Sequence, residues 1–140
     1  RYFMIHDPKE REIAIAPFRD RVVHHAIVNV LEPIYERRFI YDSYATRKGK
    51  GTLAAIMRAQ SFLRESRYYI KLDISKYFAS IDRNTLLEVL KRQLKDNRLL
   101  ELITRIVWNP PNVDGGLPIG NMTSQFFANV YLDPFDHFVK

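Results

Sequence analysis

The sequence YIKLDISKYF at residues 69–78 decides the fold. Alternate side chains of a strand face opposite sides, so Ile70, Leu72 and Ile74 would form an apolar face and Asp73 would lie on the other. Aspartate is depleted in strands, so a carboxylate that ends an apolar strand needs a reason. Asp73 either caps the strand end or binds a metal ion, since Mg²⁺ takes one or two carboxylates and shares its other positions with phosphate oxygens and water.

The composition around this stretch favours one domain with a negatively charged partner. The chain has 140 residues, of which 46% are hydrophobic, and this is enough for one sizeable core. Lysine and arginine number 22 against 16 acidic residues, and the net charge of +6 favours a phosphate-bearing partner. Cysteine is absent, which excludes disulfides and thiolate metal sites and suits a reducing compartment.

The ends of the chain and its apolar runs bear on location. No uninterrupted apolar stretch approaches the ~20 residues of a spanning helix, and residues 1–8 do not resemble a signal peptide. We therefore expect no membrane partner and a cytoplasmic location. The chain starts at Arg1 and stops at Lys140, just after an apolar run, so we expect it to be a fragment.

Hydrophobic periodicity predicts a mainly helical chain with one hairpin and one further strand. Residues 2–6 and 11–16 alternate around a turn at 7–10 and are expected to pair. The predicted helices cover residues 20–31 (interrupted at Pro33), 52–64, 83–94 (capped by Asp82), 99–107 and 123–139 (irregular near Pro134). A strand is predicted at 68–74 and a Pro/Gly loop at 109–120. This irregular alternation favours an α+β fold over a doubly wound parallel sheet.

The histidines are weak candidates for metal ligands. His24 and His25 are adjacent on a predicted helix and point about 100° apart, so they cannot chelate one ion together. His6 and His137 have no partner at ligand spacing. We expect no metal role for any of the four.

Four ordered motifs carry a resemblance to a known family. Residues 71–78 (KLDISKYF) resemble the first catalytic motif of reverse transcriptases, an aspartate followed four and five positions later by aromatic residues. Residues 11–23 (REIAIAPFRDRVV) and 43–52 (SYATRKGKGT) resemble fingers motifs of bacterial retroelement enzymes. Residues 116–125 (GLPIGNMTSQ) resemble the block before the catalytic hairpin, and are closer to enzymes of diversity-generating retroelements than to the related group II intron and retron enzymes.

The resemblance implies an α+β right-hand polymerase fold, with fingers at residues 1–66 and an incomplete palm at residues 67–140. This fold would be helix-rich, with a β-hairpin and one or more palm strands. The family's two further aspartates lie in an aromatic-x-Asp-Asp hairpin, and this sequence contains no Asp-Asp pair. We therefore expect the chain alone to be inactive, and the open edge of its palm strand predicts self-association.

The resemblance also implies a catalytic centre at Asp73. Asp73 would bind both catalytic metal ions and the carbonyl oxygen of Ile74 would bind one of them. Mg²⁺ is the implied cofactor, with two ions in the complete enzyme and Mn²⁺ as an alternative. Phe78 would lie beneath the incoming sugar and exclude a 2′-hydroxyl, although an ordinary core aromatic is the alternative interpretation. The triphosphate would be bound by the backbone N–H groups of three residues, Ser75, Lys76 and Tyr77.

The other motifs would hold the substrates. Arg11 would grip the triphosphate with its planar guanidinium, unless it is a solvated hairpin tip, and Gln125 would contact the nucleotide. The template would be contacted by four residues, Arg47, Lys48, Lys50 and Ser124. The implied partners are an RNA template, a DNA or RNA primer, deoxynucleoside triphosphates and an accessory protein.

These expectations lead to one function and one alternative. The first is an RNA-directed DNA polymerase in which a primer 3′-hydroxyl attacks the α-phosphate and pyrophosphate leaves. The alternative is a polymerase-derived module that binds nucleic acid without catalysis, which would need its basic residues but not Asp73. The spacing from Asp73 to Phe78 favours the enzyme, because a binding module has no use for a group that selects the sugar.

Overall fold

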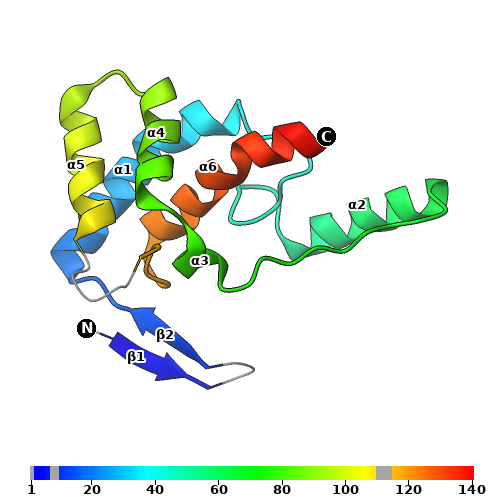
Figure 1. Cartoon of the computed structure of the whole chain (residues 1–140), viewed down its shortest axis with the longest axis horizontal. Helices are drawn as coiled ribbons and strands as arrows, with labels where there is room; N and C mark the ends of the chain where they lie inside the picture. Colours follow the sequence, from blue (N-terminus) through cyan, green and yellow to red (C-terminus); the bar gives the residue numbers. More distant parts are fainter. Residues whose placement is uncertain (1, 7–9, 110–114) are drawn as a thin grey trace.

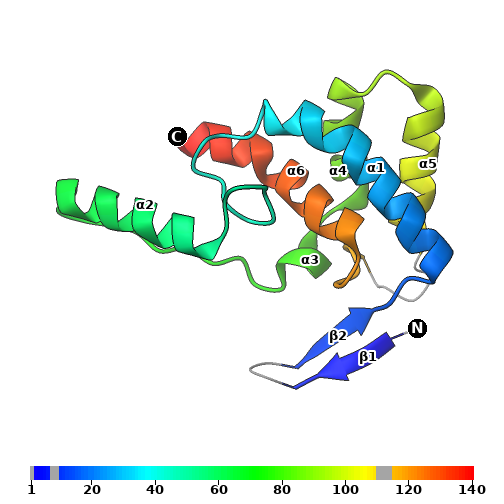
Figure 2. The same cartoon turned by 180° about the vertical axis from the view of Figure 1, so that it is seen from behind.

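The computed structural model describes residues 2–6, 10–109 and 115–140 (Figures 1 and 2). Part of the predicted turn at 7–10 and part of the predicted loop at 109–120 lie outside the described residues. None of the described helices combines the length and apolar character that crossing a membrane requires. The described elements are, in order, β1 (Tyr2–Ile5), β2 (Arg11–Ala14), α1 (Phe18–Glu36), α2 (Thr52–Glu65), α3 (Tyr77–Ser80), α4 (Arg83–Gln93), α5 (Asn97–Trp108) and α6 (Met122–Val139).

The two strands form an antiparallel hairpin at one end of the molecule. Tyr2 pairs with Ala14 and Ile5 pairs with Arg11, which confirms the predicted pairing. Figure 1 shows the hairpin beside the start of α1 and apart from α2. The fold is therefore helix-rich with a small separate sheet, as the α+β prediction requires.

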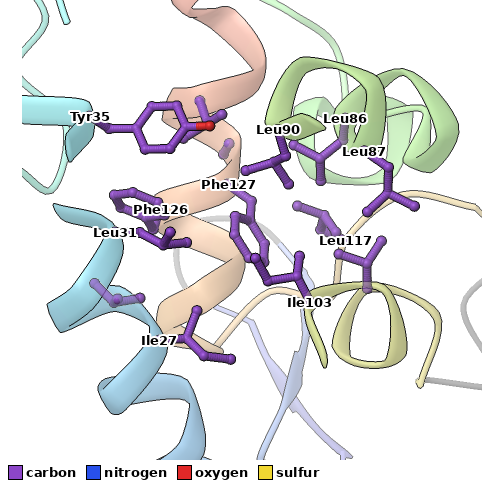
Figure 3. Packing of buried hydrophobic residues seen from close by; sticks show 14 of the residues in the cluster. Ile27, Leu31, Tyr35, Leu86, Leu87, Leu90, Ile103, Leu117, Phe126 and Phe127 are labelled. Atoms are coloured by element: carbon purple, nitrogen blue, oxygen red, sulfur yellow. The ribbon is translucent and has the colours of Figure 1, made fainter. Parts of the chain in front are cut away.

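The core lies between α1, α4, α5 and α6. Helix α6 packs against both α1 and α4, and α5 packs against α4. Leu31, Leu90, Ile103 and Val130, one from each of these helices, are 0% exposed (Figure 3). Burying one such side chain contributes about 1.5–3 kcal/mol.

Two N-caps explain where α4 and α5 begin. The Asp82 side chain accepts a hydrogen bond from the Thr85 N–H at 2.7 Å, as the sequence predicted. Asp96 does the same for α5, accepting from the N–H groups of Arg98 and Leu99 at 2.8 and 3.1 Å. Both caps satisfy backbone donors that the first turn of a helix leaves unpaired.

Helix α1 is longer than predicted, because Pro33 does not interrupt it. Proline lacks an N–H and cannot bond to the carbonyl four residues earlier, which weakens the helix locally. Leu31 and Tyr35 on either side are 0% and 1% exposed, so core packing holds the helix across the missing bond. The predicted end at Pro33 was wrong for this reason.

The predicted strand at residues 68–74 is also not formed. This segment has no regular structure, and Ile70 and Leu72 are 86% and 80% exposed. A strand exists only when a neighbouring strand pairs with its backbone, and within the described ranges only β1 and β2 pair. The segment instead runs back along α2, which projects away from the core (Figures 1 and 2).

Candidate nucleotide-binding site

Asp73 lies on the exposed segment that follows α2. Its side chain and those of the flanking Leu72 and Ile74 are exposed. Among residues 2–6, 10–109 and 115–140, no group of three His, Cys, Asp or Glu side chains is placed to hold a metal ion. Asp73 and the Ile74 carbonyl carry oxygen atoms of the kind that Mg²⁺ prefers, but two such groups are too few to hold the ion by themselves.

The chain turns sharply directly after Asp73 and Ile74. Residues 75 and 76 form a turn, and Lys76 adopts a left-handed conformation with φ 47° and ψ 45°. Residues other than glycine rarely adopt this backbone conformation. Where they do, they lie mostly in turns or next to functional sites. The turn leads into α3, which begins with the two aromatic residues of the motif.

Tyr77 and Phe78 attach this turn to the core. The Tyr77 hydroxyl donates a hydrogen bond to the Ala128 carbonyl oxygen on α6 at 2.6 Å. Burial raises the pKa of the Tyr77 hydroxyl well above its ordinary value, so it stays protonated and donates. The Phe78 ring packs against Tyr77 with 5.8 Å between centroids, and both rings are half-buried against the core.

The segment 115–120 is held tightly against the same turn. The Leu117 N–H donates to the Phe78 carbonyl oxygen at 2.7 Å, and the Arg83 Nε donates to the Gly116 carbonyl oxygen at 2.7 Å. A Cβ on Gly116 would lie 2.5 Å from the Ala79 Cα. Only glycine fits here, because φ of +66° is also in the left-handed region.

The other end of this segment holds the hairpin. The Ala14 N–H donates to the Ile119 carbonyl oxygen at 2.7 Å, at the residue pair that ends the hairpin. A Cβ on Gly120 would lie 2.6 Å from the Ala14 carbonyl oxygen, so these backbones are in close contact. Arg11 lies on β2 three residues earlier, with an exposed side chain.

The two predicted polar residues of α6 differ in exposure. Ser124 is 3% exposed and faces the core, whereas Gln125 is exposed. In this arrangement Gln125 can contact a nucleotide, but the Ser124 hydroxyl is not presented to a template. A template contact by Ser124 would need a change in this part of α6.

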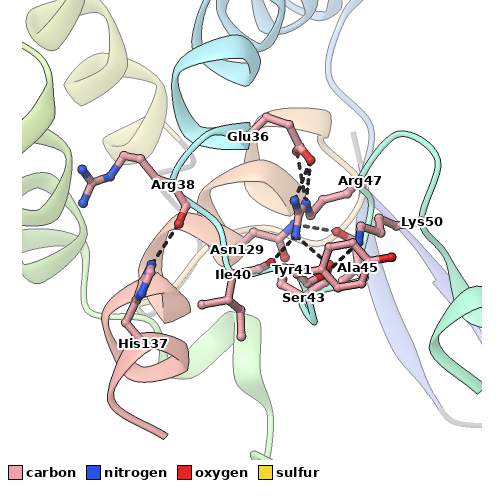
Figure 4. Close-up of polar contacts among 10 residues, drawn as sticks. All are labelled: Glu36, Arg38, Ile40, Tyr41, Ser43, Ala45, Arg47, Lys50, Asn129 and His137. Carbon is pink, nitrogen blue, oxygen red and sulfur yellow. Dashed lines mark hydrogen bonds and ion pairs between the residues drawn. The ribbon is translucent and has the colours of Figure 1, made fainter. Parts of the chain in front are cut away.

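The predicted template loop is organised around Arg47 (Figure 4). The Arg47 side chain is 6% exposed, and its Nη2 lies 2.6 Å from Glu36 Oε1. Its Nη1 donates to the carbonyl oxygens of Ile40 and Ser43 at 2.7 and 2.8 Å. The guanidinium also lies 5.3 Å from the centroid of the Phe39 ring. Arg47 thus folds the loop, and its contact with a template stays a prediction.

The two lysines of this loop differ in whether they contact the loop itself. Lys50 donates to the Tyr41 carbonyl oxygen at 2.8 Å, and its Nζ lies 3.4 Å from the centroid of the Tyr41 ring. Lys48 is exposed. Arg47 and Lys50 are engaged within the loop, so Lys48 is the basic residue of the three whose exposed side chain is available to a template.

Sequence reasoning missed the partners that position these motifs. Glu36 holds Arg47 from the last turn of α1, and the Asn129 side chain donates to the Ala45 carbonyl oxygen at 2.6 Å. Arg83 is 8% exposed and stacks over Trp108, with 5.2 Å from its guanidinium carbon to the ring centroid. Each of these residues lies 11 or more positions from its partner, so no local pattern reveals it.

Comparisons with known proteins agree with the motifs. A family profile described as reverse transcriptase (RNA-dependent DNA polymerase) matches residues 6–140. A putative COX1/OXI3 intron 2 protein of Saccharomyces cerevisiae is 27% identical over 93% of this chain and 16% of its own length. The group II intron-encoded protein LtrA of Lactococcus lactis is 28% identical over 94% of the chain and 23% of its own length.

The protein YkfC of Escherichia coli is likewise 28% identical, over 94% of this chain and 38% of its own length. The chain therefore spans less than two fifths of the length of each of these three relatives. The profile match covers nearly every residue and includes all four motifs. This chain belongs to the reverse transcriptase family.

Proposed function

We propose that this chain supplies the nucleotide- and template-facing part of a reverse transcriptase that copies RNA into DNA by two-metal nucleotidyl transfer. In this proposal residues 1–66 are the fingers and residues 67–140 are part of the palm. Helix α1 of the first part packs on α6 of the second, so the two parts share one core.

The observation that carries the proposal is the convergence of three motifs on residues 117–129, which comprise most of the fourth motif and the part of α6 that follows it. The hairpin bonds to it through Ala14 and Ile119, and the basic loop bonds to it through Ala45 and Asn129. The Asp73 motif bonds to it twice, through Tyr77 to Ala128 and through Phe78 to Leu117. This arrangement brings residues of all four motifs close enough to act on one ligand.

Each motif then has a task in the proposed reaction. Asp73 and the Ile74 carbonyl would hold metal ions, which neutralise charge on the transferring phosphoryl group when bound. Arg11 and the backbone of the turn at residues 75–77 would bind the triphosphate, and Phe78 would select the sugar. Gln125 and Lys48, whose side chains are exposed, would contact the nucleotide and the template respectively.

We also propose that these 140 residues alone do not polymerise. Two-metal transfer needs carboxylates that hold both ions roughly 3.5–4 Å apart. The described residues place no cluster of acidic or histidine side chains around Asp73, and the sequence has no Asp-Asp pair. The remaining carboxylates would have to come from elsewhere.

The test is Mg²⁺-dependent primer extension on an RNA template, with the 140-residue chain and with a natural protein that contains it. We expect extension only by the longer protein, and we expect Asp73→Asn to abolish it while binding of the template–primer without metal stays within about twofold, because the substitution leaves an exposed polar side chain. Extension by the 140-residue chain would refute the proposed inactivity.

The alternative is a module that binds nucleic acid without catalysis. The exposed, unsupported position of Asp73 favours it, since a metal-binding carboxylate is normally held by further hydrogen bonds. If the longer protein binds the template–primer but extends nothing, this alternative replaces the polymerase proposal. If extension is lost with Asp73→Asn, the alternative is excluded.

Within the family, we propose a retroelement enzyme of the type found in diversity-generating retroelements, in the cytoplasm of a prokaryote. Residues 119–125 (IGNMTSQ) support this subfamily. LtrA is named as a group II intron protein, and group II intron enzymes are the alternative subfamily.

A further inference from the structure

The segment that follows α2 leaves its backbone unpaired. Among residues 2–6, 10–109 and 115–140, only β1 and β2 pair as strands. Within the same ranges, residues 68–73 make no backbone hydrogen bond. An unpaired run of N–H and C=O groups is a template for pairing with another chain.

This segment also has the composition and the length of a strand. Four of the seven residues at 68–74 (YYIKLDI) are tyrosine or isoleucine, which favour strands, and none is proline or glycine. Seven extended residues span about 23 Å, close to the about 21 Å of the 14-residue helix α2. Figures 1 and 2 show the segment running back along α2, so it is already drawn out for pairing.

The sequence of the segment is complementary to a second copy of itself. In an antiparallel pair centred on Leu72, Lys71 of each copy lies directly opposite Asp73 of the other. On the other face Ile70 lies opposite Ile74, and the two copies of Leu72 lie opposite each other. Opposite charges therefore meet on one face of this pair, and apolar side chains meet on the other.

Neighbouring registers do not match as well. A centre at Lys71 places two lysines opposite each other, and a centre at Asp73 places two aspartates opposite each other. Like charges directly opposite each other are destabilising. A centre at Ile70 pairs Asp73 with an arginine but leaves Ile74 opposite a serine. The pattern of charged and apolar residues thus favours the centre at Leu72.

Helix α2 can cover the apolar face of such a pair. Two strands alone are only marginally stable in water, and packing against a helix is one way to stabilise them. Helix α2 lies along the segment and has no buried residue, and its Ile56 and Met57 side chains are 50% and 62% exposed (Figures 1 and 2). A dimer brings two such helices to one two-stranded ribbon, which removes apolar surface from water.

We propose that residues 70–74 form a self-association surface whose partner is a second copy of this chain, paired antiparallel about Leu72. The same residues of both copies form the interface, as two-fold symmetry requires, and each dimer contains two pairs of Lys71 with Asp73. The expectation of self-association from an open edge named no residue pairs, whereas this interface has a defined register. The proposal does not rest on the proposed function, because it uses only the backbone, charges and apolar side chains of one arm.

The first experiment uses single cysteines, because the chain has none of its own. Leu72→Cys would place two thiols directly opposite each other, with Cα atoms about 4.5–5.5 Å apart, which is within the range of a disulfide. Ile70→Cys is the matched control. Ile70 is as exposed as Leu72 (86% against 80%), but its two copies would lie about 13 Å apart along the strands, beyond that range.

Under mild oxidation we expect a disulfide-linked dimer from Leu72→Cys and little from Ile70→Cys, measured on non-reducing gels. Equal yields from the two variants, or a higher yield at position 70, would overturn the proposed register.

The second experiment exchanges the charges and measures the dimer Kd by sedimentation equilibrium. Lys71→Asp and Asp73→Lys each place like charges opposite each other, and we expect each to weaken dimerisation about tenfold, because two pairs are lost per dimer. The double exchange restores opposite charges and should return the Kd to within about threefold of the original. Lys71→Asp lowers the net charge of +6 by two, which reduces general repulsion between copies, so net charge does not explain a weaker dimer there. Single exchanges without effect, or a double exchange without recovery, would overturn the proposal.

The third experiment follows the unsubstituted chain by light scattering over a range of concentrations. We expect the 16.6 kDa monomer on dilution and twice that mass at high concentration, because an interface with two-fold symmetry closes at two copies. A chain that stays monomeric at millimolar concentration would overturn the proposal. Assemblies that keep growing beyond the dimer would overturn it as well, since they need a surface other than this self-complementary one.

Discussion

The helical core and the arm formed by α2 and residues 66–76 differ sharply in burial, although both are rich in apolar residues. In the core, Leu90 is 0% exposed, whereas Leu53 of α2 is 73% exposed. No residue of α2 is buried. The Tyr77 and Phe78 end of the motif at residues 71–78 packs against the core, while the Asp73 end belongs to the arm.

The contacts that hold the arm are polar rather than apolar. Arg58 of α2 lies 2.9 Å from Asp42, and Lys140 at the end of α6 lies 3.3 Å from the same carboxylate. Burial acts to raise the pKa of Asp42, but the hydrogen bonds from Arg58 and Lys140 outweigh it and lower the pKa below its ordinary value. Partly exposed ion pairs of this kind contribute little to stability.

This difference teaches that the two ends of the motif at residues 71–78, the Tyr77 and Phe78 end and the Asp73 end, are held unequally. Contacts within the core fix the turn at Tyr77 and Phe78. Asp73 has no such support, and the exposed apolar side chains around it are in keeping with the predicted self-association, which stays a prediction. The comparison is tested by substitutions that should affect one region and leave the other unchanged.

The largest effect is expected for Gly116→Ala, within the tight contact between residues 115–117 and α3. The new Cβ would lie 2.5 Å from the Ala79 Cα, and the residue would keep a φ of +66°. Overpacking and left-handed strain together should lower the free energy of unfolding by about 4 kcal/mol. Urea denaturation followed by circular dichroism measures it.

Gly49→Ala is the matched control for this substitution. Gly49 has a φ of +73°, but a Cβ there would have no neighbour within 4 Å. It should therefore lose only about 1 kcal/mol from strain. Similar losses at the two positions would show that the contact at Gly116 is not as tight as the backbone indicates.

Leu90→Ala and Leu53→Ala compare the two regions directly. Leu90 is fully buried between α4 and the core, so its truncation should cost about 3 kcal/mol from lost burial and the cavity left behind. Leu53 is mostly exposed, and its truncation should change stability by less than about 0.5 kcal/mol. Thermal unfolding of both variants measures the difference. A large loss at Leu53 would mean that α2 packs against an apolar surface in solution.

The sequence predicted the elements that local interactions determine. The ranges of α2, α4, α5 and α6 follow from apolar spacing, and the Asp82 cap follows from the residue type before α4. The hairpin was predicted for the same reason, because alternation and a turn lie close together in the chain.

The parts that the sequence did not predict depend on residues far away in the chain. The apolar stretch at 68–74 has the composition of a strand, but pairing needs a neighbour that the described residues do not place beside it. Packing of Leu31 and Tyr35 carried α1 through Pro33, against its local preference. For the candidate site, the motifs were found from residue types, but their convergence on residues 117–129 needed the structure.

The smallest effect concerns the joint between the two regions, the loop that Arg47 folds. Arg47→Lys keeps the charge but loses the planar fork, so the carbonyls of Ile40 and Ser43 and part of the bond to Glu36 lose their donor. We expect a loss of about 2 kcal/mol, because the charged guanidinium makes these hydrogen bonds to part-buried acceptors. Hydrogen exchange of residues 40–51 should rise with it.

Lys48→Ala in the same loop separates folding from binding. Lys48 is exposed, so its loss should leave stability within about 0.5 kcal/mol of the original while it weakens RNA binding, measured by fluorescence anisotropy. If Arg47→Lys instead weakened RNA binding without lowering stability, Arg47 would contact the template as the sequence predicted. The loop would then release the guanidinium on binding, since in this structure its bonds to Glu36, Ile40 and Ser43 hold it inside the fold.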